Sequence, residues 1–256
     1  MSPHAREDDE RVVAQLARQA LDAAEAGGGE TRLARMLLER AGEGVVDREA
    51  PASGGRAAHA WLRRYLAIEC GVRQADAVAA AGAGRRVGAA AKRGNGDIAA
   101  ELWGALVRLR GTQVGGETEA AARAGAAVDA ALARAAAGEP ALHAQHVDET
   151  LEAWTYTELT ALHALHNLAL HVDRPDWRRR VAATAAHHQQ VTQPDYTTYE
   201  PWALAAFLDE PDTRPFAEQQ LHDVTTHLRQ GTDAMAAAAI GMVLADAVHA
   251  LRLRPT

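Results

Sequence analysis

The sequence predicts an all-α protein made of stacked helical hairpins. Helix-forming residues dominate, β-branched runs are almost absent, and no stretch alternates apolar and polar residues as a strand would. Turns rich in glycine, proline and aspartate divide the chain into segments of the usual helix length. We therefore expect a disordered N-terminus at residues 1–10, followed by a single helical domain over residues 11–256.

The first half of the chain predicts helices that serve mainly as packing elements. Their apolar residues recur at helical spacing among polar residues, except in the last helix, which is mostly alanine. The expected helices are 12–24, 31–41, 57–70, 98–110 and 117–136. Asp97 has the side chain of a helix N-cap and directly precedes the fourth of them.

The second half repeats one layout, in which an apolar segment is followed by a turn and an amphipathic helix. Asp173-Arg174-Pro175 starts one such helix, with an acid as the expected cap and proline in the first turn. Thr213-Arg214-Pro215 starts another in the same order. Apolar segments at 159–172 and 202–208 precede these two starts. The pattern is typical of stacked helical hairpins with an apolar inner layer.

Histidines and aromatic residues are unevenly distributed along the chain. Residues 141–256 contain 10 of the 12 histidines and 8 of the 11 aromatic residues. A bias in codon usage would act on the whole chain, so it does not explain this difference. We therefore expect residues 141–256 to be the half that bears a functional site.

Composition excludes several classes of function. The net charge is −7 and no long basic cluster occurs, so we expect no nucleic-acid partner. Cys70 is the only cysteine, which rules out an intramolecular disulfide and thiolate zinc sites and fits a reducing, cytoplasmic location. The longest apolar run, 234–245, is too short to span a bilayer, so we expect no membrane partner. Serine-hydrolase, dinucleotide and metalloprotease motifs are absent, and we expect no cofactor.

The segment 155–171 is apolar almost all round, which is typical of a buried helix. At about 100° per residue, one stripe of this helix collects its polar side chains. They are Glu152, Tyr156, His163 and His166, with Asn167 beside them, whereas Glu158 falls on the opposite, leucine-rich side. The i,i+3 spacing of His163 and His166 could bring both rings to one ligand or one metal. A hydrogen-bonded core network, a ligand-lined cavity and a metal site all remain open.

The next helix and the loop after it carry further candidates. His188 shares the apolar stripe of the expected helix 175–191 and could be a core histidine with a partner or part of a site. The loop from Val191 to Pro201 contains Asp195 and Tyr196 between two apolar helices. Binding residues often lie on such loops, although ordinary turn chemistry would also explain the composition.

The expected last helix, 232–251, places Asp246 and His249 on its one polar side. A carboxylate buried without a partner would cost several kcal/mol, so Asp246 must find a hydrogen-bond donor. His249, at i+3, is the nearest donor in the sequence. The pair could be structural, or it could perform acid–base chemistry.

The stretch Tyr156-Thr157-Glu158-Leu159-Thr160, followed by His163 and His166, resembles an inner helix of bacterial all-helical proteins of the α/α-toroid type. The resemblance implies a barrel-like stack of helical hairpins, a full or partial toroid, around a central cavity. An irregular helical bundle is the alternative architecture. The resemblance implies no particular reaction, because toroids host enzymes and non-enzymes alike.

Two functional hypotheses follow. In the first, the chain is a small-molecule-binding or catalytic domain with a histidine-lined cavity. Its catalytic candidates are His163, His166 and Asp246, and its binding candidates are Tyr156, Asn167, His188, Asp195, Tyr196 and His249. In the second, the chain is a helical scaffold that binds a protein partner or forms a homo-oligomer without catalysis. Histidines that converge on one pocket would favour the first hypothesis, and scattered histidines with an exposed apolar patch the second.

Overall fold

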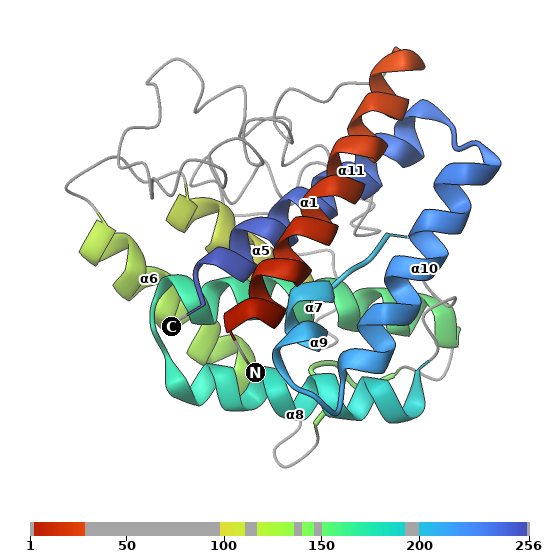
Figure 1. Ribbon diagram of the computed structural model, residues 1–256. Coiled ribbons are helices and arrows are strands. Elements are labelled where there is room, and N and C mark those ends of the chain that lie inside the picture. Colours follow the sequence, from red (N-terminus) through yellow and green to blue (C-terminus); the bar gives the residue numbers. More distant parts are fainter. Residues whose placement is uncertain are drawn as a thin grey trace, which may run out of the picture.

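A computed structural model of the chain confirms the all-α class. It describes residues 3–28, 98–110, 117–135, 140–145, 150–192 and 200–254, and within these ranges it contains eight helices and no strand (Figure 1). The expected helices at 31–41 and 57–70 lie outside the described residues. In the described ranges, no helix is both long enough and apolar enough to cross a membrane.

The helix bounds agree closely with those expected from the sequence. The helices are α1 (Pro3–Ala26), α5 (Ile98–Arg110), α6 (Glu117–Arg134), α7 (Leu151–His171), α8 (Pro175–Val191), α9 (Leu204–Asp209), α10 (Arg214–Gln230) and α11 (Ala234–Arg252). The bounds of α5 and α8 match the prediction. Helix α7 begins four residues before the expected 155, because Thr150 caps it by accepting a hydrogen bond from the Ala153 backbone N–H.

The N-terminus differs from the prediction of disorder over residues 1–10. Helix α1 begins at Pro3, and two acids of its second turn pair with distant arginines. Arg214 donates to Asp9 at 2.7 Å, and Arg252 donates to Glu10 at 2.5 Å. Two carboxylates of the segment expected to be disordered therefore hold α1 against α10 and α11.

Helix α1 packs along α11 in the opposite direction (Figure 1). Gly241 of α11 lies so close to Leu21 that a Cβ at Gly241 would be 2.5 Å from Leu21 Cδ2. A Cβ at Gly27 would similarly lie 2.6 Å from the Cβ of Ala234. Glycine at these positions therefore allows the close approach of the two ends of the chain.

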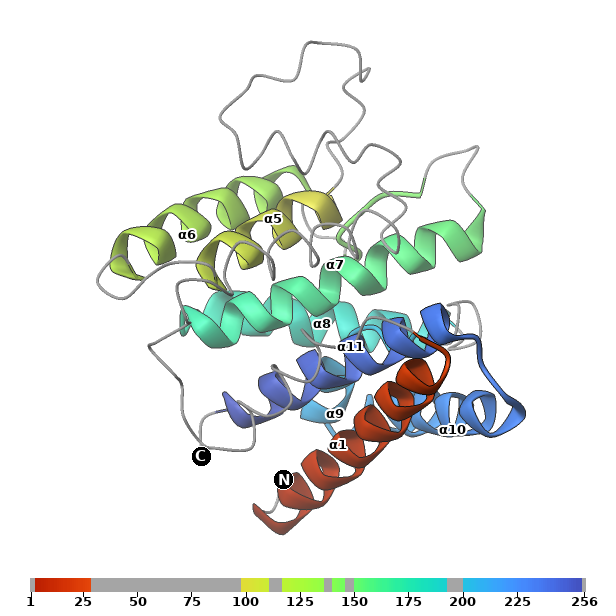
Figure 2. The same cartoon turned by 90° about the horizontal axis from the view of Figure 1, so that it is seen from above.

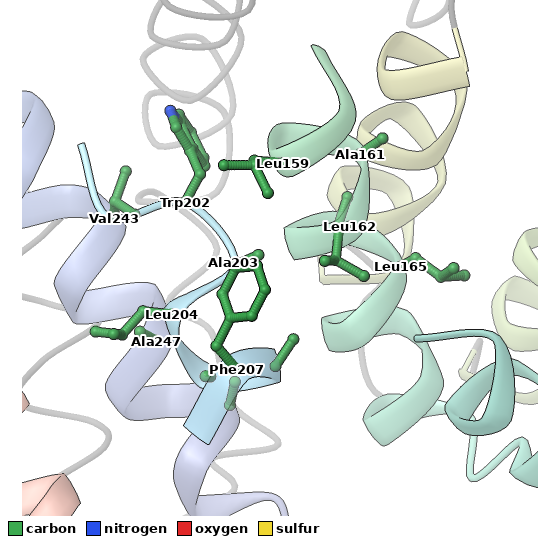
Figure 3. Close-up of a cluster of buried hydrophobic side chains, with 14 of the residues drawn as sticks. Leu159, Ala161, Leu162, Leu165, Trp202, Ala203, Leu204, Phe207, Val243 and Ala247 are labelled. Atoms are coloured by element: carbon green, nitrogen blue, oxygen red, sulfur yellow. The ribbon is translucent and has the colours of Figure 1, made fainter. Parts of the chain in front are cut away.

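Helix α7 lies at the centre of the molecule. It contacts α5, α8, α9 and α11, and in Figure 2 it lies between the α5–α6 pair and the group of α1, α9, α10 and α11. Leu159 and Leu162 of α7 are fully buried, as are Trp202 and Phe207 from the α9 region (Figure 3). This position explains why the α7 sequence is apolar almost all round.

The starts of α8 and α10 retain the predicted proline in the first turn, but the acidic cap predicted for α8 is not formed. The residue at the N-cap of α8 is Arg174, which makes no side-chain capping bond. Asp173 instead adopts a positive φ of 52° and accepts a hydrogen bond from Arg178 at 2.5 Å. An aspartate can adopt this conformation at a tight turn more easily than most residues.

Candidate functional site

Three ionisable side chains in the buried middle of α7, Glu158, His163 and His166, each contact a different neighbouring element. Because α7 is surrounded by other helices, its ionisable side chains cannot reach bulk water and must find partners inside the protein. The partners come from α8, α9 and α11, and most are carboxylates or imidazoles. The candidate site is therefore a set of buried pairs arranged along one helix.

The most enclosed of the pairs that link α7 to α11 joins His163 and Asp246. His163 Nε2 lies 2.9 Å from Asp246 Oδ2, and the two side chains are only 1% and 3% exposed. The backbone N–H of Ala203 donates to the other ring nitrogen, Nδ1, at 3.2 Å. A ring nitrogen that accepts a hydrogen bond carries no proton, so the network assigns the proton to Nε2, which donates to the carboxylate.

Aromatic rings enclose the imidazole of His163. Trp103 of α5 stacks on it with ring centroids 5.4 Å apart and an interplanar angle of 17°. Trp202 meets it edge-on, also at 5.4 Å, and Tyr156 in turn meets Trp202 edge-on at 6.1 Å. These rings exclude water from the pair, which strengthens its electrostatic interaction.

The backbone beside this pair is strained. Ala203 is 1% exposed and adopts the left-handed conformation, with φ 59° and ψ 14°. For a residue with a Cβ this conformation costs about 1–2 kcal/mol relative to the right-handed one. It also aims the Ala203 N–H at His163. Strain of this kind is often maintained at functional sites.

A second pair joins α7 to the end of α9. His166 Nε2 lies 2.7 Å from Asp209 Oδ2, and Arg254 forms an ion pair with the other oxygen of the same carboxylate. His166 is 3% exposed, whereas the Asp209 side chain is 28% exposed. This arginine–carboxylate–imidazole arrangement is therefore nearer to the surface than the His163 pair.

A third pair lies on the opposite side of α7, against α8. Glu158 Oε2 lies 3.1 Å from His188 Nε2, and both side chains are 0% exposed. His188 Nδ1 lies 2.8 Å from the hydroxyl of Thr192. With Glu158 ionised, Nε2 donates to the carboxylate and Nδ1 accepts from the hydroxyl, which gives a carboxylate–imidazole–hydroxyl series.

The C-terminal ends of α7 and α11 meet through two histidines. His171 Nδ1 donates to the Asn167 carbonyl at 2.8 Å, so its Nε2 is left to accept a hydrogen bond from His249 Nε2 at 3.3 Å. Both imidazoles are partly buried. The predicted pairing of His249 with Asp246 on the same helix is therefore wrong, because Asp246 faces α7 and pairs with His163.

The described candidates form several separate pairs, and the structure does not bring them together in one cluster. The structure brings together His163 and Asp246, and Tyr156 reaches them through its contact with Trp202. Separate pairs contain His166, His188 and His249. Asn167 donates to the His163 carbonyl within α7. Among the described residues, no group of three or more His, Cys, Asp and Glu is placed to hold a metal ion. Asp195 and Tyr196 lie outside the described residues.

Sequence reasoning did not identify several residues of these pairs. Glu158 was noticed only as a residue on the leucine-rich side, although a carboxylate in such a place requires a partner and His188 was the inward histidine of the next helix. Asp209 directly follows the apolar segment 202–208, and nothing in this pattern indicates that it pairs with a histidine. Trp103, from the half expected only to pack, showed no sign of its role because stacking partners depend on tertiary contacts.

Comparisons with known proteins do not identify a relative. The chain matches no protein-family model, and neither curated proteins nor solved structures show a significant match.

Proposed function

We propose that the chain is a small-molecule-binding or catalytic helical domain whose acid–base centre is the His163–Asp246 pair. The observation that carries this proposal is a buried imidazole–carboxylate pair, 2.9 Å apart, between two tryptophan rings. Burying ionisable groups is costly, and a buried ionisable group beside a specific charge partner is a candidate for a functional site. A purely structural core could have used apolar residues at both positions at no loss of stability.

The geometry supports a general-base role for His163. Its unprotonated Nδ1 is the atom that would accept a proton from a ligand, and Asp246 would stabilise the resulting imidazolium through the Nε2–H bond. The Ala203 N–H donates a hydrogen bond to Nδ1 at 3.2 Å, which is longer than the 2.9 Å contact between Nε2 and Asp246. A hydroxyl or ammonium group of a ligand would replace it, and the strained Ala203 backbone is suited to such a release.

We propose an architecture of stacked helical hairpins, as the repeat pattern predicts, arranged in a full or partial α/α-toroid, as the resemblance implies. Helices α7 and α8, joined by a short turn and running in opposite directions, support this proposal as one hairpin unit (Figure 1). The buried polar pairs would then lie on the inner helices, where the central cavity of a toroid forms.

A thermal-shift screen with a metabolite library tests the function. Wild type would be compared with Asp246→Asn, which removes the charge of the pair, and with Asp209→Asn as a matched change in the His166 pair. We expect at least one compound to raise the melting temperature of wild type and of Asp209→Asn, but not of Asp246→Asn. The proposal fails if no compound stabilises wild type, or if every stabilising compound acts equally on Asp246→Asn.

A specific observation also favours the second candidate function, a helical scaffold without catalysis. The described histidines have separate partners on different elements instead of converging on one pocket. Light scattering after size exclusion, over a range of protein concentrations, tests for self-association. A mass of two chains would support a homo-oligomeric scaffold, and the mass of one chain at all concentrations would exclude it.

A further inference from the structure

Helices α7 and α8 bind a short non-helical segment of the same chain through its main-chain atoms. Four consecutive residues of this segment are contacted by four side chains, which we call the peptide-contact face: Trp154 and Glu158 of α7, and Arg180 and Thr184 of α8. On each helix the two residues are spaced i,i+4, so they project from one side of it. The face is therefore built from two matched columns on neighbouring helices.

The contacts follow the order of the segment. Thr184 donates to the Pro140 carbonyl at 2.7 Å, and Arg180 donates to the Ala141 carbonyl at 2.8 Å. The Leu142 N–H donates to Glu158 Oε2 at 2.8 Å. Trp154 Nε1 donates to the His143 carbonyl, also at 2.8 Å. Because all four bonds involve main-chain atoms, they would be available to any peptide in the same conformation.

One side chain of the segment provides the apolar anchor. Leu142 is 1% exposed and belongs to the main hydrophobic core, whereas the residues that follow it, Ala144 and Gln145, are exposed. Burial of a leucine side chain stabilises an association because it removes apolar surface from water. The face thus combines main-chain hydrogen bonds with one apolar position, a common basis for peptide recognition.

The face also has unused hydrogen-bonding capacity. Glu158 Oε1 and Arg180 Nε are both buried, and neither has a hydrogen-bond partner among the described residues. Burial lowers the pKa of the Arg180 guanidinium, and the nearby charge of Glu158 opposes this effect. Buried polar atoms without partners are costly, so the segment does not satisfy the face completely.

We propose that the peptide-contact face is a binding site for a non-helical peptide segment of another protein, which presents a leucine flanked by unpaired main-chain N–H and C=O groups. Residues 140–145 occupy this site as a ligand within the same chain. An intramolecular ligand acts at a high effective concentration, of the order of millimolar for a short tether. A peptide from another protein must therefore displace it.

The test uses a fluorescent peptide with the sequence of residues 138–147, Gly-Glu-Pro-Ala-Leu-His-Ala-Gln-His-Val. Fluorescence anisotropy would measure its binding to the full chain and to Leu142→Asp, which disfavours the bound state of the internal segment. We expect the variant to bind the peptide at least tenfold more tightly than wild type. Adding Arg180→Ala should reverse the gain, whereas Arg179→Ala, at an exposed neighbouring position, should leave it unchanged.

The proposal is overturned if Leu142→Asp, with a wild-type helical spectrum, binds this peptide no better than a peptide whose leucine is replaced by aspartate. If Leu142→Asp does not fold, hydrogen exchange of the wild-type chain decides. We expect the Leu142 amide to exchange by local opening, well before the protected amides of α7 and α8. Exchange of all these amides at one common rate would show that the segment never leaves the face and would contradict the proposal.

Discussion

At the scale of single residues, Asp246 supplies the acceptor that His163 requires. Asp246→Ala removes this acceptor and leaves a buried N–H unsatisfied, so the free energy of unfolding should fall by roughly 1–3 kcal/mol. Asp246→Asn keeps an oxygen that can accept the same hydrogen bond and should cost less. Thermal and urea unfolding of the two variants beside wild type measure the difference. A melting temperature that rises in both variants would contradict a paired network and show that Asp246 is retained against stability.

The partner of Asp246 could not be predicted from the sequence. The apolar run before Asp246 indicates that this carboxylate is buried and needs a hydrogen-bond donor. The buried pair with His163 confirms this part of the prediction. The sequence showed only neighbours on the same helix, so His249 was the natural choice. The donor that it finds, His163, is 83 residues away and is brought close only by the packing of α7 near α11.

At the scale of helices, glycines in two different settings should respond in opposite ways to a larger side chain. A Cβ at Gly241 would lie 2.5 Å from Leu21 Cδ2 and 2.8 Å from its Cγ, so Gly241→Val must displace the buried side chain of Leu21 at the contact of α1 with α11. We expect a loss of roughly 1–3 kcal/mol of unfolding free energy from overpacking.

Gly125 in α6 is the matched control for this experiment. The nearest atom to a Cβ there is Arg174 Nη1, at 3.9 Å, which is an ordinary contact. Gly125→Ala should therefore stabilise the protein by about 1 kcal/mol through helix propensity alone. Chemical denaturation measures both variants. Equal effects of the two substitutions would show that α1 and α11 do not pack as closely as described.

Helix faces were easier to predict than helix neighbours. The stripe of α7 that carries His163 and His166 follows from the 3.6-residue period, and both residues are buried as expected for this helix. The period assigns a side chain to a face but does not say which element covers that face. For this reason His163 and His166, one turn apart, were expected at one site and instead reach α11 and α9.

At the scale of the whole molecule, we expect a purely helical protein. Far-ultraviolet circular dichroism of the full chain should show strong minima typical of α-helix and little contribution from strand, because no segment has a two-residue period. A spectrum that requires a sheet of four or more strands would contradict the fold and every contact that depends on it.

The class of the fold followed from the sequence because it depends on local signals repeated in every segment. Proline in the first turn of α8 and of α10 and the apolar period of α7 are visible without tertiary information. Residues 3–10, expected to be disordered, belong to α1, and two of their acids, Asp9 and Glu10, pair with Arg214 and Arg252, which are more than 200 residues away in the chain. Long-range ion pairs leave no periodic signal.

The proposed acid–base centre requires that Nδ1 of His163 is unprotonated and that Nε2 carries the proton and donates it in a hydrogen bond to Asp246. Nitrogen-15 NMR of the histidine side chains measures this directly, with His163→Gln used to assign the signals. At neutral pH the account predicts a protonated Nε2 and an unprotonated Nδ1 for this ring. A proton on Nδ1, alone or together with one on Nε2, would contradict the account, because no lone pair would then be available to accept a proton from a ligand.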